Sequence, residues 1–292
     1  MTLPYKISER KVNTYLEPEI MSRLSQRKSE KPDDHLPRND FLQWLINYAH
    51  EKLQPEEMSP RRLAKRITVM NFAGVHTSTM NITSAIFDLA SSDPSLRYAE
   101  QLREEAATVL AETGGTWTRK ALMRMYKTDS ALRDSMRLRS SASLALIRRV
   151  AAKDGLNTPD GLHLPYGTEI AIPSYGIHND ESHYPKPAEW DALRFVPPRD
   201  PIGQAEKDEG QSYVKNANGF VTIGATYLGF GLGRHACPGR FFASDMLKLL
   251  LAYIFLNYDI EPLKERPMGL HIGDQVLPPM KACIRVRRRS PV

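Results

Sequence analysis

One segment of helical character, free of proline over most of its length, constrains the fold of this chain more than any other feature. It reads SPRRLAKRITVMNFAGVHTSTMNITSAIFDLASSDP from Ser59, with apolar residues at helical spacing. Ser59 suits the N-cap, Pro60 suits the first helical position, and Pro94 ends the pattern. These signals predict a single long helix over residues 59–93, and with it a mainly helical fold.

Shorter patterns predict the remaining elements and add a small β component. The first helix among them has a cap at Asn39 or Asp40. In chain order we expect helices over 40–53, 95–112 and 118–138, a strand pair within 163–174, an irregular meander over 180–229 rich in Pro, Gly, Asp and Lys, a final helix over 240–258, and a strand within 276–289.

The composition is that of an ordinary globular protein. Of the 292 residues, 41% are hydrophobic and 25% are charged, so the chain is long enough for a substantial core and one or two domains. The net charge is +6, but the 40 Lys and Arg residues are interspersed with 34 Asp and Glu residues. A nucleic-acid-binding chain usually has a sharper basic block. We therefore expect no nucleic-acid partner, and interpret the C-terminal run RVRRRS as a solvated terminus.

Cysteine content and hydropathy narrow the cellular setting. The two cysteines, Cys237 and Cys283, exclude a disulfide framework, lack the paired spacing of a zinc site and favour a reducing compartment. The N-terminal segment has no signal-peptide core. The longest apolar run, LLLAYIFL over 249–256, is far shorter than the ~20 residues of a membrane span. We expect no transmembrane segment in this chain, which would be soluble or peripheral.

The middle of the long helix contains an unusual cluster, AGVHTS. Gly74 costs roughly 1 kcal/mol relative to Ala in a helix interior, and the following Thr77 and Ser78 are poor helix formers. Ala73 and Thr77 lie one turn apart on the same face. Two interpretations are open: a helix made thin and polar where another group approaches, or a tight crossing of two helices at Gly74.

Three further residues suggest an ion-pair network. Asp134 and Arg137 in ALRDSMRL have the spacing that places a carboxylate and a guanidinium on one face of a helix. Such a pair is most often a surface pair worth under ~1 kcal/mol. Arg194, flanked by Leu193 and Phe195 in the meander, is the kind of arginine that is drawn inward to a carboxylate. A network of the three would attach the meander to the helix.

The stretch FGLGRHACPG, residues 230–239, presents Cys237 in a loop of glycines and a proline, directly before the final helix. A thiolate is a soft ligand that suits the axial position of haem iron, where no second protein sulfur is needed. Gly233 and Gly239 would allow tight turns and a close approach of the backbone to a flat macrocycle, and Phe230 would shield the sulfur. Nearby Arg234, His235 and Arg240 offer groups for haem propionates or for an acidic partner.

At this point the sequence resembles the haem-thiolate monooxygenases of the cytochrome P450 family, above all the fungal enzymes of secondary metabolism. The family's cysteine motif, F-x-x-G-x-R-x-C-x-G, is matched by Phe230, Gly233, Cys237 and Gly239, with His235 at the arginine position. The resemblance extends over nearly all of the chain, which is similar to the C-terminal half of these enzymes. It implies one partial cytochrome P450 domain over residues 1–292, without the N-terminal half and membrane anchor.

The other motifs of the family occur in the expected order. Its oxygen-side helix motif, A/G-G-x-D/E-T-T/S, is matched by Ala73, Gly74, Thr77 and Ser78, with His76 at the acidic position. The resemblance implies that Thr77 helps deliver protons to oxygen. His76 either passes protons in that relay or faces a neighbouring helix.

The resemblance also covers the ion-pair network. The family's E-x-x-R motif is matched at Arg137, with Asp134 in place of glutamate, and WDALRF resembles the region that supplies Arg194 as the third member. Because aspartate is one methylene shorter, about 1.5 Å of reach, its bond to Arg194 is expected to lengthen or to pass through water.

What the resemblance implies for function is a monooxygenase that oxidises a hydrophobic small molecule. It implies haem b with an axial thiolate from Cys237, an NADPH-cytochrome P450 reductase as electron donor, and the cytoplasmic face of the endoplasmic reticulum as location. Two alternatives stay open: a truncated, non-catalytic remnant that binds haem weakly or not at all, and a helical interaction protein with a structural metal at His235 and Cys237.

Overall fold

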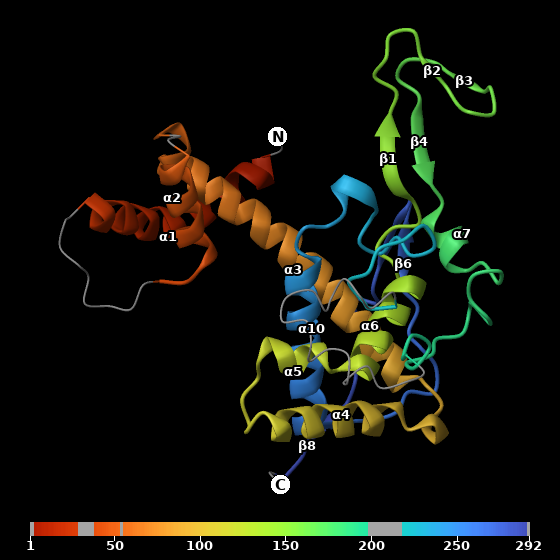
Figure 1. Ribbon diagram of the computed structural model, residues 1–292. Coiled ribbons are helices and arrows are strands. Elements are labelled where there is room, and N and C mark those ends of the chain that lie inside the picture. Colours follow the sequence, from red (N-terminus) through yellow and green to blue (C-terminus); the bar gives the residue numbers. More distant parts are fainter. Residues whose placement is uncertain (1–2, 29–37, 53–54, 198–217, 291–292) are drawn as a thin grey trace. The chain divides into compact units, whose positions relative to one another are not determined.

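The computed structural model of the protein describes residues 3–28, 38–52, 55–197 and 218–290 (Figure 1). The chain forms two compact units, residues 1–76 and 77–292, and the long helix α3 (Pro60–Ala90) runs through the boundary between them. Of the helices that the structure describes, none combines the length and the apolarity needed to cross a membrane.

The first unit is helical. It contains α1 (Leu3–Lys28), α2 (Phe41–Glu51), the 3-10 turn η1 (Pro55–Met58) and the first part of α3. Its core is a cluster of buried apolar side chains: Ile20, Leu42, Ile46, Leu63 and Ala64. The helix predicted over 40–53 is confirmed as α2, since the Asp40 side chain accepts the Gln43 N–H at 2.9 Å. Helix α1 was not predicted, because its apolar residues do not form a clear stripe.

The long helix α3 forms as its caps predict, with an earlier end. Its first turn is closed at Ser59, whose hydroxyl lies 3.3 Å from the Arg62 N–H. It ends at Ala90, three residues before the predicted 93. The reason is local: the Ser91 hydroxyl donates to the Phe87 carbonyl at 2.6 Å, and Asp93 caps the 3-10 turn η2 (Pro94–Leu96) that follows.

The core of the second unit consists of two clusters of buried apolar side chains. The helices that follow α3 in this unit are drawn in Figure 1. They are α4 (Tyr98–Glu112), α5 (Arg119–Met123), α6 (Tyr126–Leu138), the short α7 (Ser174–His178), the 3-10 turn η3 (Gly233–His235) and α10 (Arg240–Asn257). Helix α10 contributes Leu247, Leu251 and Phe255 to the core, where they meet side chains of α4 and α6 such as Leu102 and Leu132. The final helix predicted over 240–258 thus ends one residue early, because Tyr258 already begins a strand.

The prediction of one helix over 118–138 is wrong. The chain leaves the helical conformation at Met125, which has ψ 71°, and α6 starts anew at Tyr126. A carboxylate from another helix stabilises this start: Glu105 of α4 accepts the N–H groups of Lys127 at 2.6 Å and Thr128 at 2.9 Å. Burial raises the pKa of Glu105. A cap supplied by a distant segment leaves no local signal in the sequence.

The β structure consists of small antiparallel pairs. They are β1 (Ala145–Arg149) with β4 (Glu169–Ile172), β2 (Leu156–Asn157) with β3 (His163–Leu164), β5 (Tyr258–Ile260) with β8 (Val286–Arg288), and β6 (Leu270–Ile272) with β7 (Gln275–Leu277). Strands β3 and β4 both occur within the predicted 163–174, but they do not pair with each other. Gly167, at φ +84°, turns the chain so that β4 pairs with β1 instead.

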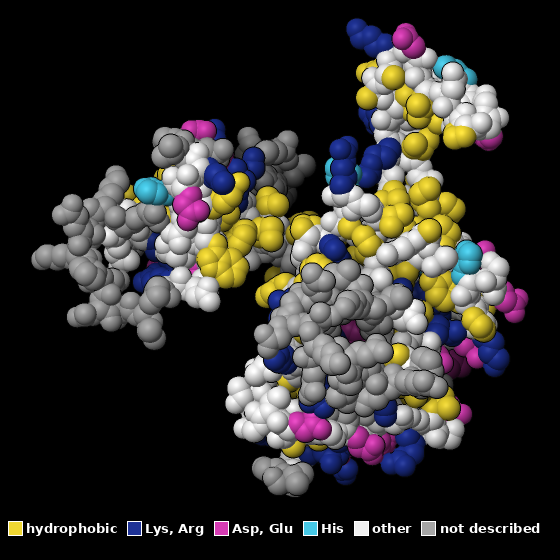
Figure 2. Space-filling view, in the orientation of Figure 1, with side chains coloured by type: hydrophobic (Ala, Val, Ile, Leu, Met, Phe, Trp, Pro, Cys, Tyr) yellow, Lys and Arg dark blue, Asp and Glu magenta, His cyan; other side chains and the backbone are white. Residues whose placement is uncertain are grey.

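Apolar side chains are exposed beside β1, β4 and β6 of the second unit, where Figure 2 shows a yellow area. The exposed apolar residues of these strands, with the residue before β1, are Leu144, Ile147, Ile170, Ile172, Leu270 and Ile272. Contiguous exposed apolar surface of this kind marks a site of interaction with a ligand or with more polypeptide.

Candidate cofactor site at the cysteine loop

The loop 228–239 is held in one conformation by backbone hydrogen bonds. The Gly231 N–H donates to the Leu228 carbonyl at 2.9 Å, and the Cys237 N–H donates to the Phe230 carbonyl at 2.8 Å. Gly231 and Gly233 have φ of +73° and +68°, in the left-handed region that favours glycine. These contacts present the Cys237 side chain at the surface, where the thiol is exposed.

The two glycines singled out from the sequence differ. Gly233 has the left-handed backbone expected of a tight turn. Gly239 has φ −83° and ψ 1°, a turn conformation that other residues also adopt, so its backbone does not by itself require glycine. A Cβ built at Gly239 would lie 3.9 Å from the Cys237 sulfur, an ordinary contact. A close approach of a cofactor to Gly239 stays a prediction.

The other predicted residues of the loop have definite partners. Phe230 is buried in the core, edge-to-face with Phe220 at 5.0 Å between ring centroids, and so anchors the loop. Arg234 Nε donates to His235 Nε2 at 3.2 Å. Arg240 Nη1 donates to the Cys237 carbonyl at 2.8 Å.

The start of α10 gives the thiol a favourable electrostatic setting. Cys237 lies two residues before the N-cap Gly239, and the Ala243 N–H donates to the Gly239 carbonyl at 2.9 Å. The dipole of α10 favours negative charge at this end of the helix. One exposed cysteine on a rigid loop fits the axial ligand of a haem iron.

A structural metal site has no support. Among the residues that the structure describes, no group of three or more His, Cys, Asp or Glu side chains lies close enough together to hold a metal ion. A structural zinc needs four such ligands, whereas His235 and Cys237 supply two.

The cluster AGVHTS lies in the middle of α3 without interrupting it. Ala73, Gly74 and His76 are in the first unit and Thr77 is in the second; all four are exposed. Nothing that the structure describes comes within 4 Å of a Cβ built at Gly74, so a tight helix crossing at this glycine is not observed. His76 packs edge-to-face on Phe72, with 4.8 Å between ring centroids.

Asp134, Arg137 and Arg194 are brought together in one ion-paired cluster. The Asp134 Oδ1 atom lies 2.6 Å from Arg137 Nε and 3.1 Å from Arg194 Nε. Its Oδ2 atom accepts the Asp191 N–H at 2.8 Å. The side chains of Asp134 and Arg137 have no exposed area, which excludes the surface-pair interpretation. The shorter aspartate contacts Arg194 directly, at a distance longer than its distance to Arg137.

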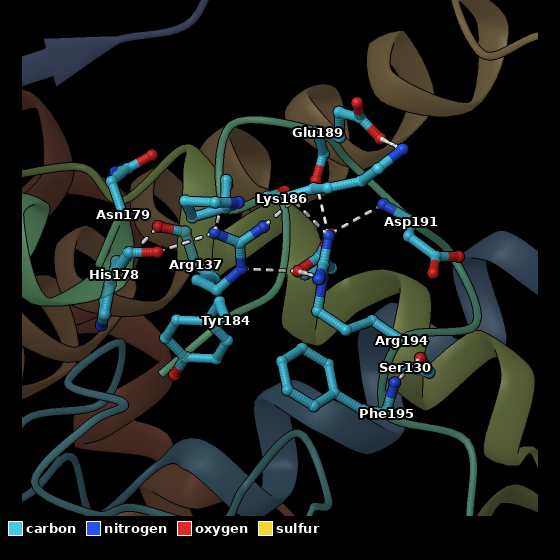
Figure 3. Close-up of polar contacts among 12 residues, drawn as sticks. Ser130, Arg137, His178, Asn179, Tyr184, Lys186, Glu189, Asp191, Arg194 and Phe195 are labelled. Atoms are coloured by element: carbon cyan, nitrogen blue, oxygen red, sulfur yellow. Dashed lines mark hydrogen bonds and ion pairs between the residues drawn. The ribbon is translucent and has the colours of Figure 1, made fainter. Parts of the chain in front are cut away.

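The two guanidinium groups fold the meander around α6 (Figure 3). Arg137 Nη1 donates to the carbonyl oxygens of His178 at 2.7 Å and Pro187 at 2.6 Å. Arg194 donates to those of Pro185 at 2.6 Å and Glu189 at 2.8 Å. Because each carbonyl is a fixed point of the backbone, these bonds set the path of the chain from α7 to Arg194.

Two residues of this region had no distinguishing sequence signal. The Arg133 guanidinium lies over the rings of Tyr227, at 3.8 Å, and Phe195, at 4.9 Å, and donates to the Thr222 carbonyl at 2.9 Å. His178 is fully buried and contacts both α6 and the cysteine loop. An arginine and a histidine in polar stretches are ordinary surface residues by pattern, so only their tertiary contacts reveal them.

Comparison with known proteins identifies the class to which this fold and site belong. The sequence model of the family described as Cytochrome P450 matches residues 3–284. The chain therefore belongs to the cytochrome P450 family. It corresponds to the C-terminal half of its relatives.

Individual relatives agree with this assignment. The chain is 36% identical over 285 residues to the cytochrome P450 monooxygenase fsoD of Humicola fuscoatra, covering 94% of this chain and 51% of that protein. It is 34% identical to the monooxygenase gloP of Glarea lozoyensis, with the same two shares. It is 33% identical to the monooxygenase polB of Polytolypa hystricis, covering 99% of this chain and 55% of polB. The chain thus spans about half the length of the curated relatives it matches.

Proposed function

We propose that this chain is the cysteine-bearing part of a haem-thiolate monooxygenase that oxidises a hydrophobic small molecule, with Cys237 as the axial ligand of haem b. The observation that carries the proposal is the loop itself. Left-handed Gly231 and Gly233, and the bond from Cys237 to Phe230, present one exposed thiol at the N-terminus of α10. Membership of the cytochrome P450 family and the monooxygenase names of the relatives support the chemistry.

The residues around the thiol have distinct tasks in this proposal. Cys237 binds the iron, and Gly233 and Gly239 keep the backbone flat beside the macrocycle. Phe230 keeps water from the sulfur, and His235 serves a propionate through Nδ1, because Arg234 already uses Nε2. Bound haem supplies the oxygen-activating redox chemistry that amino-acid side chains lack.

On α3 we assign proton handling to Thr77 and His76. A threonine hydroxyl both donates and accepts hydrogen bonds, and an imidazole exchanges protons near neutral pH. Ala73 and Gly74 have no bulky side chain at the helix surface. Apart from the backbone of α3 itself, no described atom lies within 4 Å of a Cβ built at Gly74. Asp134, Arg137 and Arg194 act at a distance from the chemistry by holding the meander.

The proposal extends to partners and place. We infer an NADPH-cytochrome P450 reductase as electron donor, the cytoplasmic face of the endoplasmic reticulum as location, and fungal secondary metabolism as context. Membership of the cytochrome P450 family supports the use of a reductase, and the organisms of the relatives support the fungal context. The location rests on the family resemblance alone.

The alternative is a non-catalytic remnant, which differs from the proposal in its affinity for haem. A haem with one face wet forfeits about 25 cal/mol of hydrophobic stabilisation per Å² left exposed. Under this alternative the chain binds haem weakly or not at all.

The test is reconstitution of the chain with haem. Under the proposal, the purified protein titrated with haemin and then reduced under carbon monoxide will show the red-shifted Soret band of a thiolate-ligated haem. Cys237→Ser will abolish this band, whereas the matched variant Cys283→Ser, at the other exposed cysteine, will retain it. A band that survives Cys237→Ser overturns the ligand assignment, and the absence of stable haem uptake by the wild-type chain favours the remnant.

A further inference from the structure

His178, at the end of α7, is a buried histidine that joins two parts of the site. It has no exposed area. Its Nδ1 atom lies 3.0 Å from the Arg137 carbonyl oxygen on α6, and its Nε2 atom lies 2.9 Å from the Leu228 backbone nitrogen at the start of the cysteine loop. Its ring also stacks on that of Tyr227, with centroids 5.7 Å apart.

These two contacts define one protonation state. A carbonyl oxygen only accepts, so Nδ1 must carry the hydrogen that reaches Arg137. A backbone N–H only donates, so Nε2 must offer its lone pair to Leu228. His178 is therefore a neutral imidazole with its hydrogen on Nδ1. Burial, aided by the positive charges of Arg137 and Arg133, lowers the pKa of His178 to about 4, in agreement with this state.

The contacts of His178 form a continuous series from the ion-paired cluster to the cysteine. Arg137, held by Asp134, donates to the His178 carbonyl, and the His178 ring donates back to the Arg137 carbonyl. Leu228, held by the ring, accepts the Gly231 N–H, which closes the first turn of the loop. Phe230, within that turn, accepts the Cys237 N–H.

We propose that His178 is a positioning residue, through which helix α6 fixes the first turn of the cysteine loop and hence the place of Cys237. The meaning of that placement for catalysis rests on the proposed function, whereas the placement itself does not. A rival explanation is that His178 merely fills space in the core, where any ring of its size would serve.

The protonation state can be measured on the wild-type chain. Nitrogen-15 resonances of the histidine rings will show one histidine with its hydrogen on Nδ1 and no titration between pH 5 and 8. His183, an exposed histidine on the same segment, is the internal reference for the assignment. A His178 ring with its hydrogen on Nε2, or one that titrates between pH 5 and 8, overturns the proposal.

Two variants separate positioning from space filling. His178→Phe keeps the ring and the stacking on Tyr227 but removes both hydrogen bonds. His178→Gln loses the ring but offers an amide oxygen to the Leu228 N–H. If the hydrogen bonds matter, hydrogen exchange at the Leu228 amide will accelerate about tenfold or more in the Phe variant, and less in the Gln variant. If only packing matters, the Phe variant will be the milder of the two, which overturns the proposal.

The loop itself supplies the second readout. In His178→Phe, the rate at which iodoacetamide alkylates Cys237 will change relative to the rate at Cys283 in the same molecule. The backbone amides of Cys237 and Leu228 will both lose protection from hydrogen exchange. His183→Phe, the matched control, will change neither. Protection lost uniformly over α6 and α10 shows general destabilisation and counts against positioning. None of these experiments uses haem. The proposed function can therefore fail while His178 is still a positioning residue, and the positioning role can fail while the proposed function stands.

Discussion

The Arg137 guanidinium lies 2.6 Å from the Asp134 carboxylate, and neither side chain has any area exposed to solvent. The same carboxylate oxygen also accepts from Arg194. A carboxylate in this position neutralises two arginines whose other hydrogen bonds go to backbone carbonyls of α7 and of the meander. The cluster is thus a buried, connected network, for which removal of one member is far more costly than for a surface pair.

We expect Asp134→Asn to lower the free energy of unfolding by about 3–5 kcal/mol, because it leaves buried guanidinium charge without its carboxylate. The matched control is Glu189→Gln, the same chemical change in an exposed pair with Lys186, which will cost under ~1 kcal/mol. Urea unfolding at constant pH measures both. Equal small effects would show that the buried network contributes little to stability.

Replacing Asp134 by glutamate, the acid of the family motif, is also expected to lower the stability of the fold. Asp134→Glu adds a methylene to a site without exposed area, and overpacking of this kind costs about 1–3 kcal/mol. The measurement is the shift of the urea midpoint at unchanged slope. A Glu variant as stable as the wild type would mean that the meander adjusts freely around position 134.

Stability is expected to depend on pH through His178. Its pKa is lowered from 6.5 to about 4 in the folded state, so the unfolded chain binds more protons between these values. The contribution of neutral His178 to the free energy of unfolding is complete above pH 6.5. It is lost as the pH falls towards 4, by roughly 3 kcal/mol in total.

Because other groups titrate in the same range, the informative quantity is the difference between two proteins. Unfolding free energies of the wild type and of His178→Gln, measured from pH 7 to pH 4.5, should converge as the pH falls. Parallel curves would contradict the lowered pKa.

Two glycines are expected to respond to alanine with opposite signs. A Cβ at Gly229 would lie 2.5 Å from the sulfur of the buried Met136, so Gly229→Ala will destabilise by about 1–3 kcal/mol. A Cβ at Gly74 would have no described atom within 4 Å apart from the backbone of its own helix. Gly74→Ala will therefore stabilise the helix by up to ~1 kcal/mol. Thermal unfolding of the two variants tests both signs.

The same Gly74 variant tests the role proposed for the α3 cluster. If a cofactor approaches Gly74, the alanine variant will take up less haem although its polypeptide is more stable. Unchanged uptake would return Gly74 to the status of an ordinary helix residue.

Much of this protein could be predicted from local patterns. The start of α3 follows from Ser59 and Pro60, and that of α2 from Asp40, because a cap acts within one turn of the residue that supplies it. The cysteine loop was recognisable because its glycines and cysteine are neighbours in the chain, and a left-handed turn at Gly233 depends on that residue alone. The family motifs are of this local kind as well.

The tertiary structure decided what depends on residues distant in the chain. Helix α6 begins where it does because Glu105 reaches it from α4. Strand β4 pairs with β1, which is farther away in the chain than β3. The spacing of Asp134 and Arg137 is the same in a surface pair and in a buried one. The meander, whose backbone carbonyls accept hydrogen bonds from the arginines, buries the pair, so that loss of one member becomes costly. His178 likewise has a role only where α6 and the cysteine loop meet, since its hydrogen-bond partners lie 41 and 50 residues away.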